Sequence, residues 1–409
     1  MNLKIEQPER NVIDMIPEKM LELGKKRSEI REIFEYGKKR AGEIGADKVF
    51  DFSIGNPNVP APEFIRETIV DLLTNEEPTK IHGYTSAQGD FGARKALADH
   101  INGKYGAQVT ADHFYLTAGA AASLSLCCRA LALPGDEFLT FAPYFPEYKV
   151  YVESAGGILS VIPADTENFQ IDLEKFACAL NQKTKAVIIN SPNNPSGVVY
   201  SSDTIKKMCA LMEEKSKEFG HPIYLISDEP YRELVYGDVE VPFLLNHYDN
   251  TLVCYSYSKS LSLPGERIGY VLLSNRMKDG EDIYAAICGA GRALGYVCAP
   301  SLFQHLIGRC AGRTADISIY KKNRDILYSG LIEMGYECAK PDGAFYLFLK
   351  ALEPDAVAFC ERAKKHELLL VPGDGFGCPG YVRISYCVRT DQIEASLPAF
   401  EKLAEDYKN

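Results

Sequence analysis

Lys259 is the first residue in this sequence whose surroundings suggest chemistry. It stands in the stretch SYSKSLSLPGERIGY, directly after the apolar run TLVCY, and Arg267 follows it eight residues later. An ammonium group at the end of a buried strand costs free energy unless its charge is removed, paired or used. A lysine at such a place is more often a solvated loop residue, so the neighbouring motifs decide whether this amine has a chemical role.

Polar and aromatic residues follow other apolar runs of strand length as well. Asn194 follows the run KAVIIN, and Asp228 and Tyr231 follow IYLIS. Phe145 follows DEFLTF, and Gly119, Ala120 and Ala121 follow HFYLT. Residues 119–121 open a helix-like pattern, whose free backbone N–H groups suit a phosphate. Because ligands of parallel α/β sheets bind outside the carboxyl ends of the strands, we expect these residues to line one crevice with Lys259.

The order of strand-like and helix-like runs predicts an α/β fold. Seven apolar runs of strand length alternate with helix-like patterns: HFYLT, DEFLTF, GILSVIP, KAVIIN, IYLIS, TLVCYS and RIGYVLLS. Such alternation favours a mostly parallel seven-stranded sheet covered by helices. From about Gly312 the pattern changes to a long helix, the short strands YECAK, AFYLFL and YVRISYC, and a final helix, which indicates a smaller α+β domain. We expect an N-terminal arm and part of the small domain in residues 1–55, a large domain in 56–311 and the small domain in 312–409.

Composition and charge restrict the possible functions. The chain has 409 residues, a net charge of -11 and 46% apolar residues. Proteins that bind nucleic acid or anionic membranes do so through surplus Lys and Arg, so neither partner is expected. No apolar run has the length of a membrane span, and MNLKIEQPER lacks the apolar core of a signal peptide, so a cytoplasmic location is the default expectation. The twelve cysteines show no CxxC spacing, which argues against a zinc ribbon or a disulfide framework, and no metal is expected.

Four motifs in this sequence resemble those of one enzyme family. The stretches SPNNPSG, SDEPYREL, SYSKSLSLPGERIGY and YVRISY occur in this order, with 34 residues from Asn194 to Asp228 and 31 from Asp228 to Lys259. In order and separation they resemble the class I aminotransferases of pyridoxal-phosphate fold type I, in particular the members that are similar to aspartate aminotransferase. The resemblance covers nearly the whole chain. Any one motif would be weak evidence, whereas four in register are strong.

The resemblance implies catalytic roles for three residues. Lys259 would form a Schiff base with the aldehyde of pyridoxal 5'-phosphate and, once the substrate displaces it, would move a proton from the substrate α-carbon. Asp228 would keep the pyridine nitrogen protonated through an ion pair. Tyr231, together with Asn194, would donate hydrogen bonds to the phenolic oxygen of the cofactor.

The other cofactor contacts are implied in the same way. The phosphate would be held by Ser256, Ser258, Arg267 and the helix start at Gly119, Ala120 and Ala121. Relatives usually carry a hydroxyl or amide side chain at this helix start, so the contact here is made by backbone alone or is supplied by Ser123. Phe145 would stack on the ring. Tyr84, in HGYTSAQGD, resembles a tyrosine that reaches the phosphate of the neighbouring subunit's cofactor, which implies a homodimer with shared active sites.

An amino acid and a 2-oxo acid are the implied substrates. Arg383 would clamp the α-carboxylate by two parallel hydrogen bonds, with Gly55 and Asn194 beside it. Arg292 is the candidate second cation for a dicarboxylate, which favours aspartate or glutamate; its alternative is a structural role at the dimer interface. Alanine, aromatic or branched substrates stay open, as does a lyase that eliminates a sulfur leaving group from the β-carbon. A non-catalytic sensor would need a DNA-binding extension, and residues 1–50 do not match a helix-turn-helix.

Overall fold

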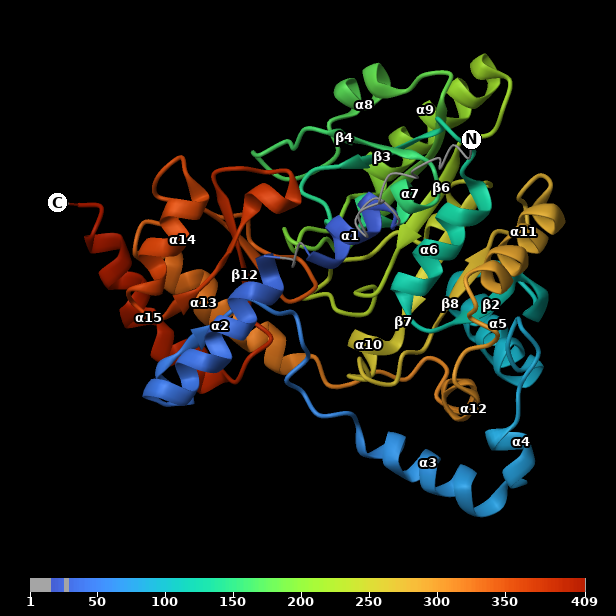
Figure 1. Cartoon of the computed structure of the whole chain (residues 1–409), viewed down its shortest axis with the longest axis horizontal. Helices are drawn as coiled ribbons and strands as arrows, with labels where there is room; N and C mark the ends of the chain where they lie inside the picture. The colour runs from blue at the N-terminus through green and yellow to red at the C-terminus, as the bar shows by residue number, and fades with distance from the viewer. Residues whose placement is uncertain (1–15, 26–28, 409) are drawn as a thin grey trace, which may run out of the picture.

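A seven-stranded sheet forms the centre of the larger part of the molecule (Figure 1). The computed structural model describes residues 16–25 and 29–408. In spatial order the strands are β2 (Phe114–Thr117), β8 (Gly269–Leu273), β7 (Thr251–Ser256), β6 (Tyr224–Asp228), β5 (Thr184–Asn190), β3 (Glu137–Phe141) and β4 (Ile158–Ile162). Strands β3 to β7 run parallel to one another, and β8 is antiparallel to both β2 and β7. Each strand lies on one of the seven predicted apolar runs, so the predicted α/β sheet is confirmed.

Helices cover both faces of this sheet. One face carries α6 (Ala120–Leu131), α7 (Glu147–Ser154) and α11 (Gly280–Ala293). The other side carries α3 (Glu63–Asn75), α4 (Pro78–His82), α5 (Phe91–Tyr105), α8 (Leu173–Ala179), α9 (Ser202–Phe219) and α12 (Ser301–Arg309). Successive strand residues point to opposite faces. On β7, Leu252 and Cys254 accordingly pack with the first set of helices, and Val253 and Tyr255 with the second.

A three-stranded antiparallel sheet lies in the C-terminal part of the chain. Its order is β11 (Val371–Pro372), β12 (Tyr381–Ser385) and β9 (Tyr346–Lys350), and the helices of this part are α13 (Ser318–Glu333), α14 (Ala356–Lys364) and α15 (Thr390–Glu405). The N-terminal segment joins it, because β1 (Phe50–Asp51) pairs with β10 (Leu368–Leu369) and Ile33 of α2 (Glu29–Ile44) shares a core with Phe348 and Val371. The division of the chain at residues 56 and 312 stays a prediction.

Short elements connect these parts. They are α1 (Glu18–Lys25), α10 (Tyr257–Ser260) and the single 3-10 turns η2 (Ala46–Lys48), η3 (Ala111–His113), η4 (Leu244–Asn246) and η5 (Gly373–Phe376). Lys19 of α1 pairs with Glu153 of α7 at 3.3 Å, which fixes α1 against the larger part. The element that matters most for the site is α10, since it begins directly after β7 and carries Lys259.

The predicted strand YECAK is wrong. Residues 336–340 pair with β9 through a single bridge, between Cys338 and Leu349, and through one further backbone hydrogen bond, from the Lys350 amide to the Glu337 carbonyl at 2.9 Å. Gly335 precedes this segment with φ +91°, and Pro341 follows it without an N–H group to donate. These two residues limit the pairing to a bridge.

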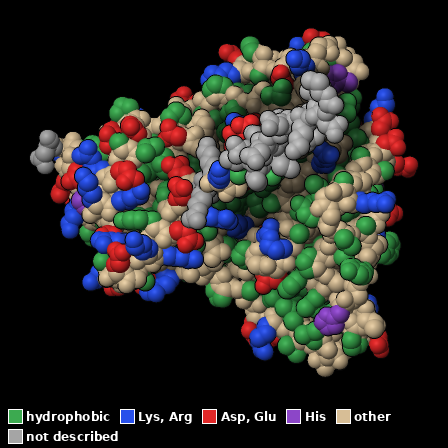
Figure 2. Space-filling model, viewed as in Figure 1, with side chains coloured by type: hydrophobic (Ala, Val, Ile, Leu, Met, Phe, Trp, Pro, Cys, Tyr) green, Lys and Arg blue, Asp and Glu red, His purple; other side chains and the backbone are tan. Residues whose placement is uncertain are grey.

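The visible surface mixes charges of both signs. Figure 2 shows Lys and Arg side chains interspersed with Asp and Glu side chains at the end of the molecule that holds the C-terminal helices. Within residues 16–25 and 29–408, no helix combines the length and the apolar character needed to cross a bilayer.

Candidate active site

Three neighbouring strands of the central sheet end in polar residues at the same edge. Asn190 ends β5, Asp228 ends β6 and Ser256 ends β7. Asn190 stands opposite Asp228 in the register of the first pair. All three lie in strands whose residues are buried almost throughout, because both faces of the sheet are covered. The sheet therefore places an amide, a carboxylate and a hydroxyl at one edge, with the lysine of α10 immediately beyond it.

Lys259 has the environment of a reactive amine. Its Nζ donates a hydrogen bond to the Gly55 carbonyl at 2.5 Å and lies 5.3 Å from the centre of the Phe345 ring. Burial lowers the pKa of Lys259 to about 8, and the positive charges of Arg383 and Arg267 act in the same direction. A substantial fraction of the amine is then neutral near physiological pH, which a nucleophile or general base requires.

Asp228 is held by a residue that the sequence analysis did not identify. The phenol of Tyr148, on α7, donates a hydrogen bond to Oδ2 of Asp228 at 2.7 Å, and both side chains are buried. Oδ1 has no hydrogen-bond partner among the described residues. Burial raises the pKa of Asp228 to about 7, with the Tyr148 bond opposing this effect. A buried carboxylate with one oxygen free is well suited to pair with a cationic N–H group.

Asn194 lies in a hydrogen-bond network that connects Asp228 with Arg383. The amide Nδ2 of Asn190 donates to the Asp228 carbonyl at 2.8 Å, and Oδ1 of Asn190 accepts from the Asn194 backbone N–H at 2.7 Å. Oδ1 of Asn194 accepts from Nη1 of Arg383 at 3.1 Å. Asn190 is a second residue that the sequence analysis missed, although it directly precedes the SPNNPSG motif.

Arg383 is a buried cation without an acidic partner. It lies on β12, is 2% exposed, and takes part in no ion pair among the described residues. Its guanidinium faces the rings of Tyr346 and Phe376, with centroid distances of 4.8 and 5.0 Å, and Nη2 donates to the Ser53 carbonyl. Its Nε has no partner there, and burial lowers the pKa of this guanidinium. Because a buried unpaired charge is costly, the site favours an anion such as a carboxylate.

Tyr231 and Gly55 meet at the side chain of Tyr346. The hydroxyl oxygens of Tyr231 and Tyr346 are 2.9 Å apart, and both residues are buried. A Cβ atom at Gly55 would lie 2.0 Å from the Tyr346 hydroxyl, so the side chain of any other residue would displace that tyrosine. The Gly55 carbonyl is also the acceptor for Lys259, which brings this backbone into the site.

The start of α6 forms a cradle for an anion. Gly119, the residue before α6, has φ +89° and no side chain caps the helix, so the first N–H groups, including those of Ala120 and Ala121, are free to bind a ligand. The Arg267 guanidinium lies against Gly119, at 2.8 Å from where a Cβ would be. The Ser123 hydroxyl instead contacts Thr117 at 2.8 Å and is fully buried, which favours the backbone contact over a Ser123 contact.

Ser256 and Ser258 lie near this cradle. Their hydroxyls are 2.7 Å apart, and Ser256 stands opposite Gly269 in the register of β7 and β8. Gly269 packs against Gly119, since a Cβ added at Gly269 would lie 3.0 Å from the Gly119 Cα. The structure thus brings the two serines, Arg267 and the helix start to one region, as the sequence predicts.

Phe145, Tyr84 and Arg292 make fewer contacts than the other predicted site residues in the described part of the chain. Phe145 contacts Tyr148 edge to face, with ring centroids 5.7 Å apart. Tyr84 is 91% exposed, and Arg292 is exposed near the end of α11. In the described part of the chain, neither of these two side chains makes a hydrogen bond or an ion pair.

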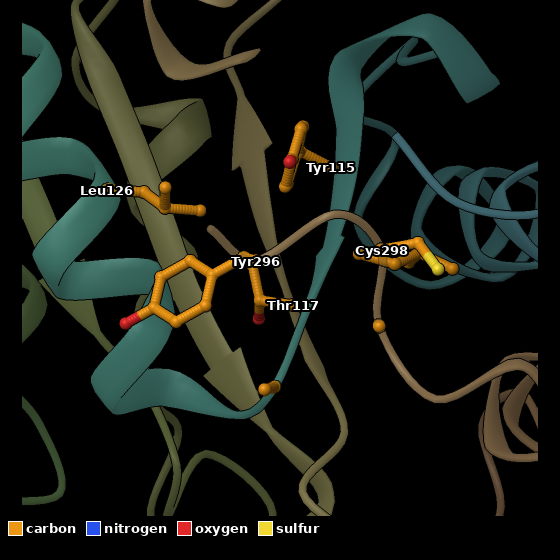
Figure 3. A pocket seen from close by; sticks show the side chains of 8 residues that line it. Tyr115, Thr117, Leu126, Tyr296 and Cys298 are labelled. Carbon is orange, nitrogen blue, oxygen red and sulfur yellow. The ribbon is translucent and has the colours of Figure 1, made fainter. Parts of the chain in front are cut away.

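A small cavity lies beside the start of α6 (Figure 3). Tyr115 and Thr117 of β2, Leu126 of α6, and Tyr296 and Cys298 of the segment before α12 surround it. Its lining contains neither Lys259 nor Asp228. It is mainly apolar and adjoins the cradle, whereas the charged and polar groups converge at the strand ends.

The combined groups suit a cofactor that carries an aldehyde, a basic ring nitrogen and a phosphate. The partly neutral amine of Lys259 suits the aldehyde, and the unpaired oxygen of Asp228 suits the ring nitrogen. The uncapped start of α6 beside Arg267 suits the phosphate. In the described ranges, no group of three or more His, Cys, Asp or Glu side chains is placed to hold a metal ion.

Comparisons with known proteins agree with this geometry. The family model described as "Aminotransferase class I and II" matches residues 47–400. Aspartate aminotransferase of Thermotoga maritima is 31% identical over 87% of this chain and 91% of its own length, and its crystal structure superimposes with a TM-score of 0.83 at 30% identity, covering 95% of this chain and 99% of the other. The aspartate/prephenate aminotransferase of Thermus thermophilus is 30% identical over 85% of this chain and 89% of its own length. A crystal structure of an amino transferase from Eubacterium rectale is 60% identical, with a TM-score of 0.95, and covers 96% of this chain and 99% of that one.

Proposed function

The chain belongs to the class I and II aminotransferases, and from this premise we propose that it transfers the amino group of an amino acid to a 2-oxo acid with pyridoxal 5'-phosphate bound beside Lys259. The observation that supports this most is that three groups converge in one region. They are the partly neutral Lys259 amine, the Asp228 carboxylate with one unpaired oxygen, and Arg383, which has no acidic partner among the described residues. When bound, this cofactor supplies an aldehyde that joins to amines and a pyridine ring that withdraws electrons from the substrate α-carbon.

Lys259 and Asp228 carry the proton chemistry in this proposal. Nζ of Lys259 would hold the cofactor and would move a proton at the substrate α-carbon, a role that its partly neutral amine suits. Asp228 holds a proton on the ring nitrogen through its free Oδ1, while Tyr148 fixes the other oxygen. Tyr231 and Asn194 donate hydrogen bonds to the ring oxygen.

The remaining contacts orient the cofactor and the substrate. Ser256, Ser258, Arg267, and the backbone at Gly119, Ala120 and Ala121 bind the phosphate, and the Phe145 ring covers the pyridine face. Arg383 binds the α-carboxylate through its free edge, with Asn194 and the Gly55 backbone beside it. Nε of Arg383 has no hydrogen-bond partner among the described residues and is therefore available for this contact.

We infer a preference for the dicarboxylates aspartate and glutamate. Relatives from Thermotoga maritima and Thermus thermophilus carry the names aspartate and aspartate/prephenate aminotransferase. Arg292 supplies a cation that makes no ion pair among the described residues and could meet a second carboxylate.

The proposal includes a homodimer with shared sites. Tyr84 is 91% exposed in one chain, which is unusual for a large aromatic side chain and suits a contact with the phosphate bound by a second copy. Light scattering should give twice the chain mass of 45.4 kDa. Mixing Tyr84→Ala and Lys259→Ala chains should restore measurable activity in the mixed dimers, because one of their two sites then has both residues intact. A monomer that is fully active would contradict this part.

One spectroscopic experiment tests the function. Single amino acids are added to the cofactor-loaded protein, and the loss of the visible absorption band is followed in time. Aspartate and glutamate should convert the cofactor to its amino form fastest, and 2-oxoglutarate should restore the band. Indifference to both would contradict the dicarboxylate preference. Steady release of ammonia and pyruvate from a cysteine-type substrate, without any oxo acid, would instead identify the β-eliminating lyase.

A further inference from the structure

Tyr346 is a buried tyrosine that touches three residues of the site. It begins β9 and is 2% exposed. Its hydroxyl lies 2.9 Å from that of Tyr231, its ring lies 4.8 Å from the Arg383 guanidinium, and its hydroxyl closes over Gly55. Tyr346 belongs to the C-terminal sheet, whereas Tyr231 follows β6 of the central sheet, so the contact between the two phenols joins the two sheets.

We propose that Tyr346 is a positioning residue that couples the carboxylate clamp at Arg383 to the phenol of Tyr231. This inference rests on the proposed function, because it takes Tyr231 as the donor to the cofactor and Arg383 as the ligand of the substrate carboxylate. Tyr346 itself touches neither the cofactor nor the substrate in this account.

The hydroxyl of Tyr346 determines how Tyr231 can use its single proton. Among the described residues, Tyr346 is the hydrogen-bond partner of the Tyr231 hydroxyl, and either oxygen could be the donor. If Tyr231 donates to the cofactor, it must accept from Tyr346. Burial raises the pKa of Tyr346 to about 12, so the phenol keeps the proton that it needs to donate. A donor that itself accepts a hydrogen bond is a stronger donor, because consecutive bonds polarise one another.

The ring of Tyr346 holds Arg383 from one face. The guanidinium lies over this ring and over that of Phe376, at 4.8 and 5.0 Å, and no carboxylate of the described residues pairs with it. Aromatic faces attract a cation without using its N–H groups. Tyr346 therefore stabilises the charge of Arg383 while leaving hydrogen-bond donors free for a substrate carboxylate.

Gly55 connects this arrangement with the reactive amine. The Tyr346 hydroxyl occupies the space where a Cβ of residue 55 would be, and the Gly55 carbonyl accepts the hydrogen bond from Lys259. A movement of the Tyr346 side chain would therefore change the surroundings of Tyr231, Arg383 and Lys259 together.

Tyr346→Phe tests the hydroxyl. The readout is the pH midpoint of the visible absorption of the cofactor-loaded protein, without substrate. The hydrogen bond from Tyr231 stabilises the negative charge on the cofactor's ring oxygen once the neighbouring proton is lost. A weaker hydrogen bond therefore raises the pH midpoint of this proton loss. We expect an upward shift of about 0.2–0.5 pH unit for Tyr346→Phe and a larger one for Tyr231→Phe. Tyr336→Phe is the matched control, because this buried phenol donates to the Phe400 carbonyl at 2.8 Å, away from the site, and should leave the midpoint unchanged.

Tyr346→Leu tests the ring. The readout is the dissociation constant of succinate, a dicarboxylate that cannot react, measured from the absorption of the loaded protein. Removing the aromatic face should weaken succinate about fivefold, whereas Tyr346→Phe keeps the face and should stay within about twofold of the parent chain. Melting temperatures of all variants, compared with Tyr336→Phe, show whether each one is folded.

The outcomes separate this inference from the function on which it rests. A shift for Tyr231→Phe with none for Tyr346→Phe overturns the coupling and leaves the proposed function intact. No shift for either variant means that Tyr231 does not donate to the cofactor, so the coupling and the role of Tyr231 in the proposed function both fail. Succinate binding that is equal in Tyr346→Leu and the parent chain overturns the ring's role. If the leucine variant does not fold, the phenylalanine variant still decides the role of the hydroxyl.

Discussion

Tyr148 donates a hydrogen bond to Oδ2 of Asp228 over 2.7 Å, and this contact joins α7 to the end of β6 across 80 positions in the sequence. It leaves Oδ1 of the same carboxylate without a partner in the described part of the chain. The geometry therefore separates two tasks within one side chain: one oxygen anchors the carboxylate, and the other is free for the ring nitrogen of the proposed cofactor.

Tyr148→Phe should lower kcat while changing KM little. The substitution keeps the ring and removes the anchor of the carboxylate, so Asp228 becomes a poorer partner for a cation. We expect kcat to fall about three- to tenfold, with a stability loss of about 1–3 kcal/mol for the hydrogen bond to a charged group. Steady-state kinetics and denaturant unfolding measure the two effects.

Tyr248→Phe is the control for Tyr148→Phe. Tyr248 is also buried, and its phenol donates to the Ile223 carbonyl at 2.7 Å, so the variant should lose stability but keep kcat. A Tyr148→Phe enzyme with normal kcat would show that the anchor has no role in catalysis.

Asp228→Asn should stabilise the cofactor-free protein at neutral pH. Burial raises the folded-state pKa of Asp228 to about 7, above its unfolded value near 4, so the folded state binds a proton that the unfolded state has released. Stability then falls as the pH rises from about 4 to about 7, and the asparagine, which cannot ionise, avoids that loss.

Melting curves between pH 4 and 8 measure this difference. The variant should match the parent near pH 4 and exceed it by up to about 4 kcal/mol above pH 7, because each unit of pKa difference corresponds to about 1.4 kcal/mol, while its affinity for pyridoxal phosphate falls. Asp203→Asn is the control, since Asp203 forms an exposed pair with Lys207. A variant that is less stable than the parent at pH 8, without cofactor, would contradict the prediction.

Arg383→Lys should weaken the binding of every amino-acid substrate. A lysine ammonium cannot make two parallel hydrogen bonds to a carboxylate, and each such bond to a charged group contributes about 1.5–3 kcal/mol, so KM should rise about 10- to 100-fold. Arg324→Lys is the matched control, because Arg324 is also buried over a tyrosine ring, that of Tyr236 at 4.7 Å, and donates to the Pro341 carbonyl. Equal KM changes in the two variants would argue against the clamp.

Arg292→Gln should affect dicarboxylate substrates alone. Loss of one charged contact should lower kcat/KM for aspartate about 10- to 100-fold and leave that for alanine within about twofold. Equal losses for both amino acids would instead assign Arg292 to the dimer interface. The comparison of two substrates in one variant corrects for any change in folding.

The sequence predicted the strands and the strand-end residues well, for a physical reason. Strands buried on both faces require nearly continuous apolar runs, and the residue that ends such a run, as Asp228 ends β6, must lie at the ligand-binding edge. Lys259 and Arg383 stand out in the sequence because their motifs are local. Their surroundings in the folded chain, such as the bond from Lys259 to Gly55 across 204 positions, are not visible in the local pattern.

The partners of these residues could not be predicted in this way. Tyr148 stands three residues after Phe145, in the first turn of α7, but nothing in that spacing indicates a carboxylate 80 positions away. Tyr346 reads as an ordinary core residue of a strand, and its contact with Tyr231 depends on how two sheets meet. The segment YECAK pairs with β9 only through a bridge, because Gly335 and Pro341 flank it.

Reduction of the cofactor-loaded protein with borohydride, followed by peptide mapping, tests the central claim most directly. The claim is that Nζ of Lys259, with its pKa lowered to about 8, is the amine that binds the cofactor aldehyde. The account predicts one stable pyridoxyl group, on the peptide that contains Lys259, and none in Lys259→Ala. A pyridoxyl group on another lysine, or none on freshly loaded protein, would contradict it.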